Sequence, residues 1–228
     1  MRINYKRGLS MNIAGYIEHT NLQAVATAAD IASLCNEAKQ YGFFGVCVHP
    51  SYITYAKQCL QHTDIRITTV VGFPLGATGA AVKAAETAYA IACGADEVDM
   101  TVAIGRVKMG DWDYVADDMR RVVIAAEGRP VKVILETAYL TEKEKKQVCY
   151  LAGETGAAFV KTSTGFAPGG ATVEDVARMA SWAAPALGIK AAGGIRDYQT
   201  AMRMIAAGAT RLGTSASVRI MEGALHEG

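Results

Sequence analysis

The sequence lacks the features that mark secreted, membrane-spanning and polyanion-binding proteins. No uncharged run approaches the length that a helix needs to cross a membrane. The start of the chain is basic, but no apolar segment of the signal-peptide kind follows, so we expect residues 1–10 to be a loose extension. Basic and acidic residues nearly cancel, at 23 against 22, which predicts neither nucleic acid nor a membrane surface as a partner. We therefore expect a soluble, cytoplasmic protein.

Cysteine patterns of disulfide frameworks and zinc sites are also missing. The chain has five cysteines, an odd number, and none shows the CxxC spacing of a zinc or redox site. Most lie in apolar segments, as is typical of reduced, buried thiols. No linker or low-complexity stretch divides the 228 residues, so residues 11–228 are predicted to form one domain with a substantial core.

One pattern recurs along the chain: a helix that ends in a glycine, followed by a short apolar strand. The glycines are Gly42, Gly94, Gly156 and Gly208, and each suits the left-handed conformation that closes a helix. A second strand falls in each interval between them, and one more precedes them all. The eight predicted strands span residues 16–19, 43–48, 67–71, 97–102, 131–135, 159–162, 189–191 and 211–213.

Apolar strands that alternate with helices are typical of a parallel sheet. Eight such units in a chain of this length favour a closed (β/α)8 TIM barrel over an open sheet. Several predicted helices begin with a capping box, in which a threonine and an acid three residues later bond each other's backbone. These boxes are Thr27–Asp30, Thr141–Glu144 and Thr172–Asp175. The sequence therefore predicts a single-domain α/β barrel, whose chemistry lies where the strands end.

Lys161 ends a buried strand and is followed by three hydroxyl residues and a glycine. An ammonium in such a place has lost hydration, so it must be paired or deprotonated. Strand alternation turns Asp99 and Lys132 towards the barrel axis, near Lys161 and Lys190. Two interpretations remain open at this point. One is a buried ion network that only braces the barrel. The other is an amine nucleophile kept partly neutral by a second ammonium.

Glycine-rich segments follow the last two predicted strands. Gly193 and Gly194 come after the seventh strand, whereas Gly213 ends the eighth and Ser215 follows it. Bare backbone N–H groups, hydroxyls and a helix N-terminus together make an anion site. Barrel enzymes frequently bind phosphate at these two loops, so the sequence predicts a phosphate site there.

An alternative hypothesis is a metal site at the strand ends, formed by Glu18, His19 and His49. The histidines have neither HxH nor HxxxH spacing, which favours histidines satisfied by ordinary hydrogen bonds. Cys47 is interpreted as a wall residue rather than a nucleophile, because no histidine–acid pair accompanies it in the sequence. We therefore predict no metal and no other cofactor.

Eight segments of the chain together resemble the deoxyribose-phosphate aldolase family in its shorter bacterial form. The resemblance runs from about residue 13 to residue 220, and its most specific segments are GADEVDM (94–100) and KTSTGF (161–166). The other segments are GVCV (45–48), VGFPLGA (71–77), VKVILET (131–137), GGATVED (169–175), IKAAGGI (189–195) and GATRLGTS (208–215).

This resemblance implies a metal-independent class I aldolase. It would reversibly cleave 2-deoxy-D-ribose 5-phosphate to acetaldehyde and D-glyceraldehyde 3-phosphate, so small phosphorylated sugars and aldehydes would be its substrates. By position, Lys161 matches the family's Schiff-base lysine, Lys190 its second lysine and Asp99 its proton-relay aspartate. The phosphate-contacting positions match Gly165, Gly193, Gly194, Gly213 and Ser215. Glu18, Cys47 and Thr162 are further pocket candidates, and a homodimer is the expected assembly.

The chain departs from the family pattern mainly near its start. Glu18 stands where aspartate is usual, His49 where asparagine is common, and Thr101 and Ala103 replace the usual valine and asparagine. We therefore expect a different selectivity towards the acceptor aldehyde. Two alternatives stay open: a Schiff-base aldolase of another phosphorylated sugar, and a non-catalytic barrel that binds sugar phosphates.

Overall fold

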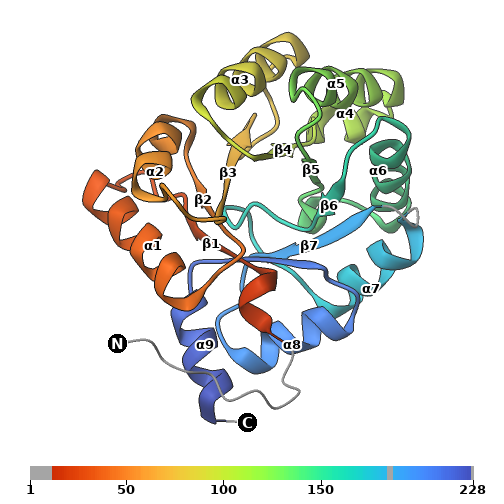
Figure 1. The fold of residues 1–228 in the computed structure, drawn as a ribbon. Helices are drawn as coiled ribbons and strands as arrows, with labels where there is room; N and C mark the ends of the chain where they lie inside the picture. The colour runs from red at the N-terminus through yellow and green to blue at the C-terminus, as the bar shows by residue number, and fades with distance from the viewer. Residues whose placement is uncertain (1–11, 184–186, 227–228) are drawn as a thin grey trace.

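A computed structural model describes residues 12–183 and 187–226 of the chain. Eight parallel strands form a closed barrel in chain order, and helices surround it (Figure 1). The strands are β1 (Ile17–Asn21), β2 (Gly45–Val48), β3 (Arg66–Val71), β4 (Glu97–Thr101), β5 (Val131–Ile134), β6 (Phe159–Lys161), β7 (Gly188–Ala192) and β8 (Arg211–Thr214). All eight predicted strands are confirmed, with ends that shift by about two residues at most. The predicted extension, residues 1–10, lies outside the described residues.

Helices connect successive strands and cover the outside of the barrel (Figure 1). They are α1 (Ala28–Tyr41), α2 (Ile53–Cys59), α3 (Ala80–Cys93), α4 (Ile104–Met109), α5 (Trp112–Ala125), α6 (Glu142–Glu154), α7 (Val173–Trp182), α8 (Tyr198–Ala206) and α9 (Ser217–His226). Short 3₁₀ helices are η1 (Ile13–Tyr16), η2 (Pro50–Tyr52) and η3 (Thr137–Tyr139). No helix among the described residues is long and apolar enough to cross a bilayer.

The helix ends follow the sequence signals, with one correction. Thr27 and Thr141 form the predicted reciprocal capping boxes. Thr172 accepts the Asp175 N–H at 3.0 Å, but the Asp175 carboxylate accepts from Lys145 Nζ at 2.5 Å instead of returning to the cap. The third box is therefore only half formed, because an ammonium on the neighbouring helix is the stronger partner.

The glycines that were predicted to close helices all have positive φ. Gly42 and Gly94 are the C-caps of α1 and α3, at φ 68° and 104°. Gly156 and Gly208 follow the caps of α6 and α8 directly, at φ 85° and 112°. A side chain would strain this conformation, so these positions turn the chain from each helix back into the next strand.

Strand alternation separates an apolar shell from a polar barrel interior. On β4, Val98 and Met100 face the helices and belong to the main hydrophobic core, whereas Asp99 points inward. Burying an apolar side chain of this size stabilises the fold by roughly 1.5–3 kcal/mol. The interior, in contrast, holds Lys132 and Lys190 with no solvent exposure. The shell therefore supplies stability, and the interior is left for charged groups.

Candidate active site

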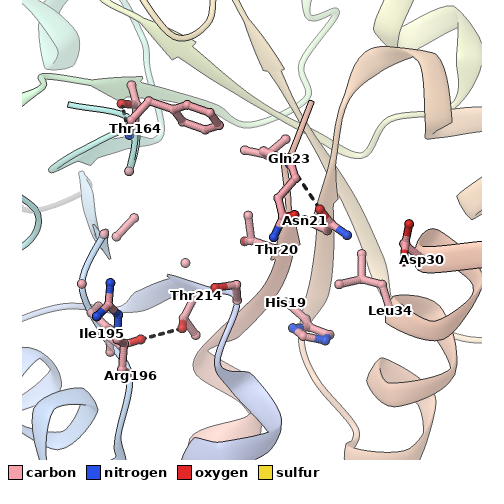
Figure 2. A pocket seen from close by; sticks show the side chains of 18 of the residues that line it. His19, Thr20, Asn21, Gln23, Asp30, Leu34, Thr164, Ile195, Arg196 and Thr214 are labelled. Atoms are coloured by element: carbon pink, nitrogen blue, oxygen red, sulfur yellow. Dashed lines mark hydrogen bonds between the residues drawn. The ribbon is translucent and has the colours of Figure 1, made fainter. Parts of the chain in front are cut away.

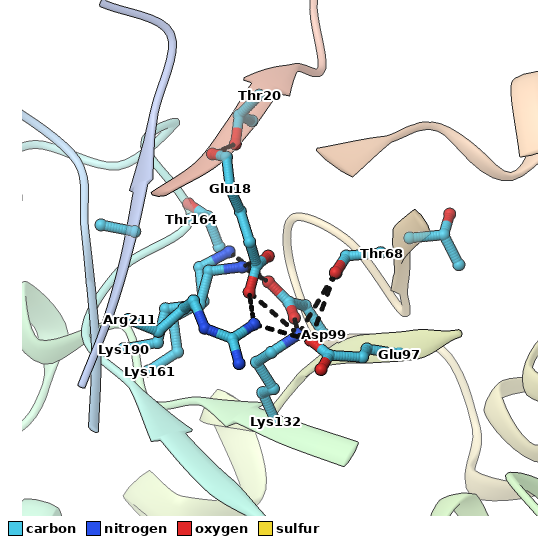
Figure 3. Close-up of polar contacts among 12 residues, drawn as sticks. Glu18, Thr20, Thr68, Glu97, Asp99, Lys132, Lys161, Thr164, Lys190 and Arg211 are labelled. Atoms are coloured by element: carbon cyan, nitrogen blue, oxygen red, sulfur yellow. Dashed lines mark hydrogen bonds and ion pairs between the residues drawn. The ribbon is translucent and has the colours of Figure 1, made fainter. Parts of the chain in front are cut away.

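Asp99 is the centre of an ion network inside the barrel (Figure 3). Its Oδ2 lies 2.8 Å from Lys161 Nζ and 2.7 Å from Lys190 Nζ, and its Oδ1 lies 2.8 Å from Lys132 Nζ. The strand register produces this arrangement, because Asp99 pairs with Lys132 across β4 and β5, and Lys161 pairs with Lys190 across β6 and β7. Three predicted inward-facing lysines thus share one carboxylate.

A second tier of the network lies around Glu18 (Figure 3). Glu18 forms ion pairs with Lys190 and with Arg211, whose Nη1 lies 2.9 Å from Glu18 Oε1. Arg211 Nη1 also contacts Glu97 Oε2 at 3.0 Å, and Lys132 Nζ contacts the same oxygen at 2.7 Å. Closure of the barrel makes these contacts, because β8 and β1 pair side by side.

These charges hold one another in their ionised forms. Burial by itself would raise the pKa of Asp99, but the three ammonium groups around it bring that pKa well below its ordinary value. Burial acts on Glu18 in the same direction, but Lys132 and Lys190 outweigh it, and the pKa of Glu18 falls to about 2. Burial would also lower the pKa of Lys190, but Asp99 and Glu18 raise it. Lys190 is therefore a firmly held cation.

The network carries one positive charge in excess. Its cations are Lys132, Lys161, Lys190 and Arg211, and its carboxylates are Glu18, Glu97 and Asp99. Lys161 has one ion pair among the described residues, fewer than any other cation of the network. One amine of the network can thus be neutral without leaving a carboxylate unpaired.

A cavity of about 480 Å³ adjoins the network at Lys161, and Figure 2 shows residues that line it. Lys161 lines it, together with residues of the loops after β1, β6, β7 and β8 and one face of α1. All five predicted phosphate positions line the cavity: Gly165, Gly193, Gly194, Gly213 and Ser215. Three of these glycines have positive φ, between 78° and 89°, so the loops need glycine for their shape. The amine and the anion-type loops thus share one chamber.

Comparison with known proteins identifies this architecture. A model of the DeoC/LacD family of aldolases matches residues 14–222. This chain belongs to the DeoC/LacD aldolase family. Its relatives include the deoxyribose-phosphate aldolase of Thermococcus gammatolerans, which is 55% identical over 220 residues that cover 95% of this chain and 98% of the relative. The deoxyribose-phosphate aldolase of Macrococcus caseolyticus is 54% identical, over 93% of this chain and 97% of its own length.

A solved structure supports the same assignment. The deoxyribose phosphate aldolase of Aeropyrum pernix superposes with a TM-score of 0.88 at 32% identity. The match covers 95% of this chain and 92% of that one. The protein is therefore an aldolase, which is a class of lyase, with the barrel fold described above.

The further pocket candidates of this aldolase lie beneath the cavity rather than on its wall. Glu18, Cys47 and Thr162 are completely buried. The Thr162 hydroxyl bonds the backbone of Ala192 at 3.0 Å and so ties β6 to β7. Cys47 packs with Leu22 in a small apolar cluster, and burial raises the pKa of its thiol to about 11. This thiol is a poor nucleophile at neutral pH.

The three residues of the metal hypothesis do not converge in the aldolase. Glu18 faces the lysines, whereas His19 Nε2 lies 2.7 Å from Glu37 on α1 and His49 Nε2 lies 2.9 Å from the Leu22 carbonyl. Ligand atoms of Glu18, Cys47 and Asp99 do lie within 4.8 Å of one another. The carboxylates of Glu18 and Asp99 already form ion pairs with lysine ammonium groups. These three residues are therefore better suited to bind lysine side chains than a metal ion.

Sequence analysis overlooked several residues of this site. Arg196 follows the paired glycines after β7, is exposed, and lines the cavity (Figure 2). Its signal was an arginine directly beside a predicted anion loop. Arg211 and Glu97 brace the network from below. An arginine at the start of a short apolar strand gave no comparable signal, because its partners are 193 and 114 residues away in the chain.

Proposed function

We propose that this aldolase reversibly cleaves 2-deoxy-D-ribose 5-phosphate to acetaldehyde and D-glyceraldehyde 3-phosphate through a Schiff base on Lys161. One observation carries the proposal: Lys161 belongs to the ion network and also lines a cavity whose wall includes the phosphate-type loops. The names of the relatives, deoxyribose-phosphate aldolases at 55% and 54% identity, support the choice of substrate.

The neutral amine of Lys161 attacks the C1 aldehyde of the open-chain sugar. Loss of water leaves an iminium, which withdraws electrons from the C2–C3 bond. Removal of the C3 hydroxyl proton turns C3 into the aldehyde of glyceraldehyde 3-phosphate, and the bonding electrons form an enamine on Lys161. Protonation of the enamine at C2 and hydrolysis then release acetaldehyde and restore the amine.

Asp99 and Lys190 serve these proton transfers as a pair. Asp99 is held as a carboxylate that can receive a proton, and Lys190 is held as an ammonium that can supply one. The two groups meet at one oxygen, Asp99 Oδ2, which also contacts Lys161 Nζ at 2.8 Å. Protons therefore pass through this pair, with an intervening water molecule, to and from the reacting carbons.

The phosphate is bound at the loops after β6, β7 and β8. Gly193 and Gly194 offer backbone N–H groups, Ser215 lies two residues before α9, and Arg196 adds a cation at the same wall. A helix N-terminus and bare amides favour a phosphate dianion. Binding there holds the far end of the sugar so that C1 reaches Lys161.

The decisive experiment measures acetaldehyde release from deoxyribose 5-phosphate, with a panel of other phosphorylated sugars alongside. We expect deoxyribose 5-phosphate to be cleaved with the highest kcat/KM, and EDTA to leave the rate unchanged. Preference for another sugar phosphate would reassign the substrate. Binding of the sugar phosphate without turnover would indicate a non-catalytic barrel.

We further propose that the enzyme is a homodimer. The Aeropyrum pernix relative is described as having a unique tetrameric structure, so a tetramer is the alternative that the measurement must separate from a dimer. Sedimentation equilibrium of the purified enzyme would measure the state directly, and a monomer at micromolar concentration would contradict the proposal.

A further inference from the structure

Glu136, which follows β5, has a strained backbone in a buried place. Its φ of 56° and ψ of 66° lie in the left-handed region, which residues with a side chain rarely adopt. The other described non-glycine residues with positive φ are His62 and Glu127, and both are exposed, whereas Glu136 is only 2% exposed. Strain of this kind persists where surrounding contacts require it, and it gathers at functional sites.

The carboxylate of Glu136 is buried without an ion pair to any described residue. It accepts the Thr164 backbone N–H at 3.3 Å and 3.2 Å with its two oxygens. It also accepts a hydrogen bond from the Thr164 hydroxyl. A buried carboxylate is costly unless hydrogen bonds satisfy it, so Thr164 is the partner that keeps Glu136 in place.

Thr164 links Glu136 to the wall of the cavity through hydrogen bonds. Its Oγ1 donates to Glu136 and accepts the Phe166 N–H at 3.1 Å. Thr164, Gly165 and Phe166 all line the cavity, and they begin three residues after Lys161. Thr164 is labelled in Figure 2. A buried anion therefore fixes the shape of the loop that contributes Gly165 to the phosphate wall.

The contacts on either side of Glu136 explain why the left-handed turn is needed. Leu135 N–H donates to the Lys161 carbonyl at 2.9 Å, and Thr137 N–H donates to the Thr162 carbonyl at 3.0 Å. The two segments thus stay side by side beyond the last residues of β5 and β6. The left-handed Glu136 sits between these two bonds, and its side chain reaches the next loop rather than the barrel interior.

We propose that Glu136 is a positioning residue for phosphate recognition: through Thr164 it holds the loop 164–166 in the shape that binds the phosphate. The inference rests on the proposed function only for the identity of the substrate. It assigns Glu136 no part in Schiff-base formation, because its carboxylate contacts Thr164 and none of the lysines.

The test compares Glu136→Leu with the conservative Glu136→Gln. Calorimetric titration with inorganic phosphate measures the affinity of the phosphate site directly. Comparison of KM for deoxyribose 5-phosphate with KM for free deoxyribose measures the contribution of the phosphate during turnover. We expect Glu136→Leu to weaken phosphate affinity and to raise KM for the phosphorylated sugar by about tenfold or more, as loss of hydrogen bonds to a charged group predicts. KM for free deoxyribose should change by less than about twofold, and Glu136→Gln should restore most of the loss, because its amide can still accept from Thr164.

A second variant keeps the test decisive if Glu136→Leu does not fold. Thr164→Val removes the hydroxyl but keeps the backbone N–H, and should weaken phosphate affinity in the same sense. If both variants fold, the double variant should lose less than the sum of the single losses, because Glu136 acts through Thr164.

Equal losses on phosphorylated and free sugar, or unchanged phosphate affinity in Glu136→Leu and Thr164→Val, would overturn the positioning role. Absence of turnover in the unmodified enzyme would instead overturn the proposed function. The phosphate titrations would still decide the role of Glu136 in that case.

Discussion

Two buried ion clusters in this aldolase are equally dry but differ in their balance of charges. Between α3 and α5, Lys83 Nζ lies 2.6 Å from Asp118 Oδ2, and both side chains are fully buried. Burial lowers the pKa of Lys83 and raises that of Asp118, and their mutual attraction does not reverse either shift. Inside the barrel, the pKa of Asp99 falls and that of Lys190 rises, although both are also fully buried.

The difference shows how many oppositely charged neighbours a buried group needs in order to stay ionised. A single opposite charge does not outweigh the loss of hydration, whereas several around one group do. The Lys83–Asp118 pair therefore acts as a brace, which Lys83 completes by donating to the Thr101 carbonyl at 2.9 Å. The network around Asp99, in contrast, keeps Asp99 and Lys190 ionised beside Lys161, which lines the cavity.

The sharpest test of the comparison removes the one network cation that lines the cavity. Lys161→Ala should lower kcat for sugar cleavage by at least about 10,000-fold, because no other group can form the Schiff base. Borohydride with acetaldehyde should ethylate one peptide of the unmodified enzyme, the one that contains Lys161, and nothing in the variant. Stable modification of Lys132 or Lys190 with Lys161 left free would falsify the assignment.

Removal of the second ammonium should have the next largest effect. Lys190→Leu should lower kcat by about 1,000-fold, since a proton-transfer partner is lost. Without the neighbouring positive charge, Lys161 should keep its proton to higher pH, so the remaining activity should shift to alkaline pH. The pH profile of kcat/KM measures this, and an unchanged profile would show that Lys190 does not tune the amine.

Glu18 makes the network sensitive to acid. Its folded-state pKa is depressed to about 2 from an ordinary value of 4.5, so its contribution to stability is present above about 4.5 and is lost as the pH falls towards 2. At pH 7, Glu18→Gln should therefore lower the free energy of unfolding by on the order of 3 kcal/mol. Urea unfolding of both proteins from pH 7 to pH 2 should show this difference shrink. A difference that does not vary with pH would contradict the assigned origin.

The Lys83–Asp118 pair should show the smallest effect, provided that both partners are replaced. Lys83→Met with Asp118→Leu should change the free energy of unfolding by less than about 1 kcal/mol and leave kcat within about twofold. Lys83→Met alone should cost about 3–5 kcal/mol, because it leaves Asp118 buried and unpaired. Thermal unfolding and the cleavage assay measure both, and a large loss of activity in the double variant would place this pair in the catalytic machinery.

The positions of the strands were predictable from the sequence because their signals are local. The same holds for the inward direction of Asp99, Lys161 and Lys190. Asp99 alternates with Val98 and Met100 on β4, so its direction follows from the period of a strand. Lys161 stands at the end of an apolar run that is too short to be anything but a strand. The half-formed box at Thr172 could not be foreseen, because Lys145 comes to Asp175 from a different helix.

The local pattern of residues determined which faces of each strand are charged and which glycines shape the loops. Only closure of the barrel decided how many partners each charge has. Glu18 reaches Lys190 across 172 residues because β8 pairs with β1. The role of Gly213 also depends on tertiary contacts that the sequence does not reveal. A Cβ at this position would lie 3.0 Å from Lys190 Cε. This predicted phosphate-binding glycine therefore also leaves room for the Lys190 side chain. Hydration loss and the number of opposing charges are set by contacts between distant strands, and those contacts decide which lysines stay charged.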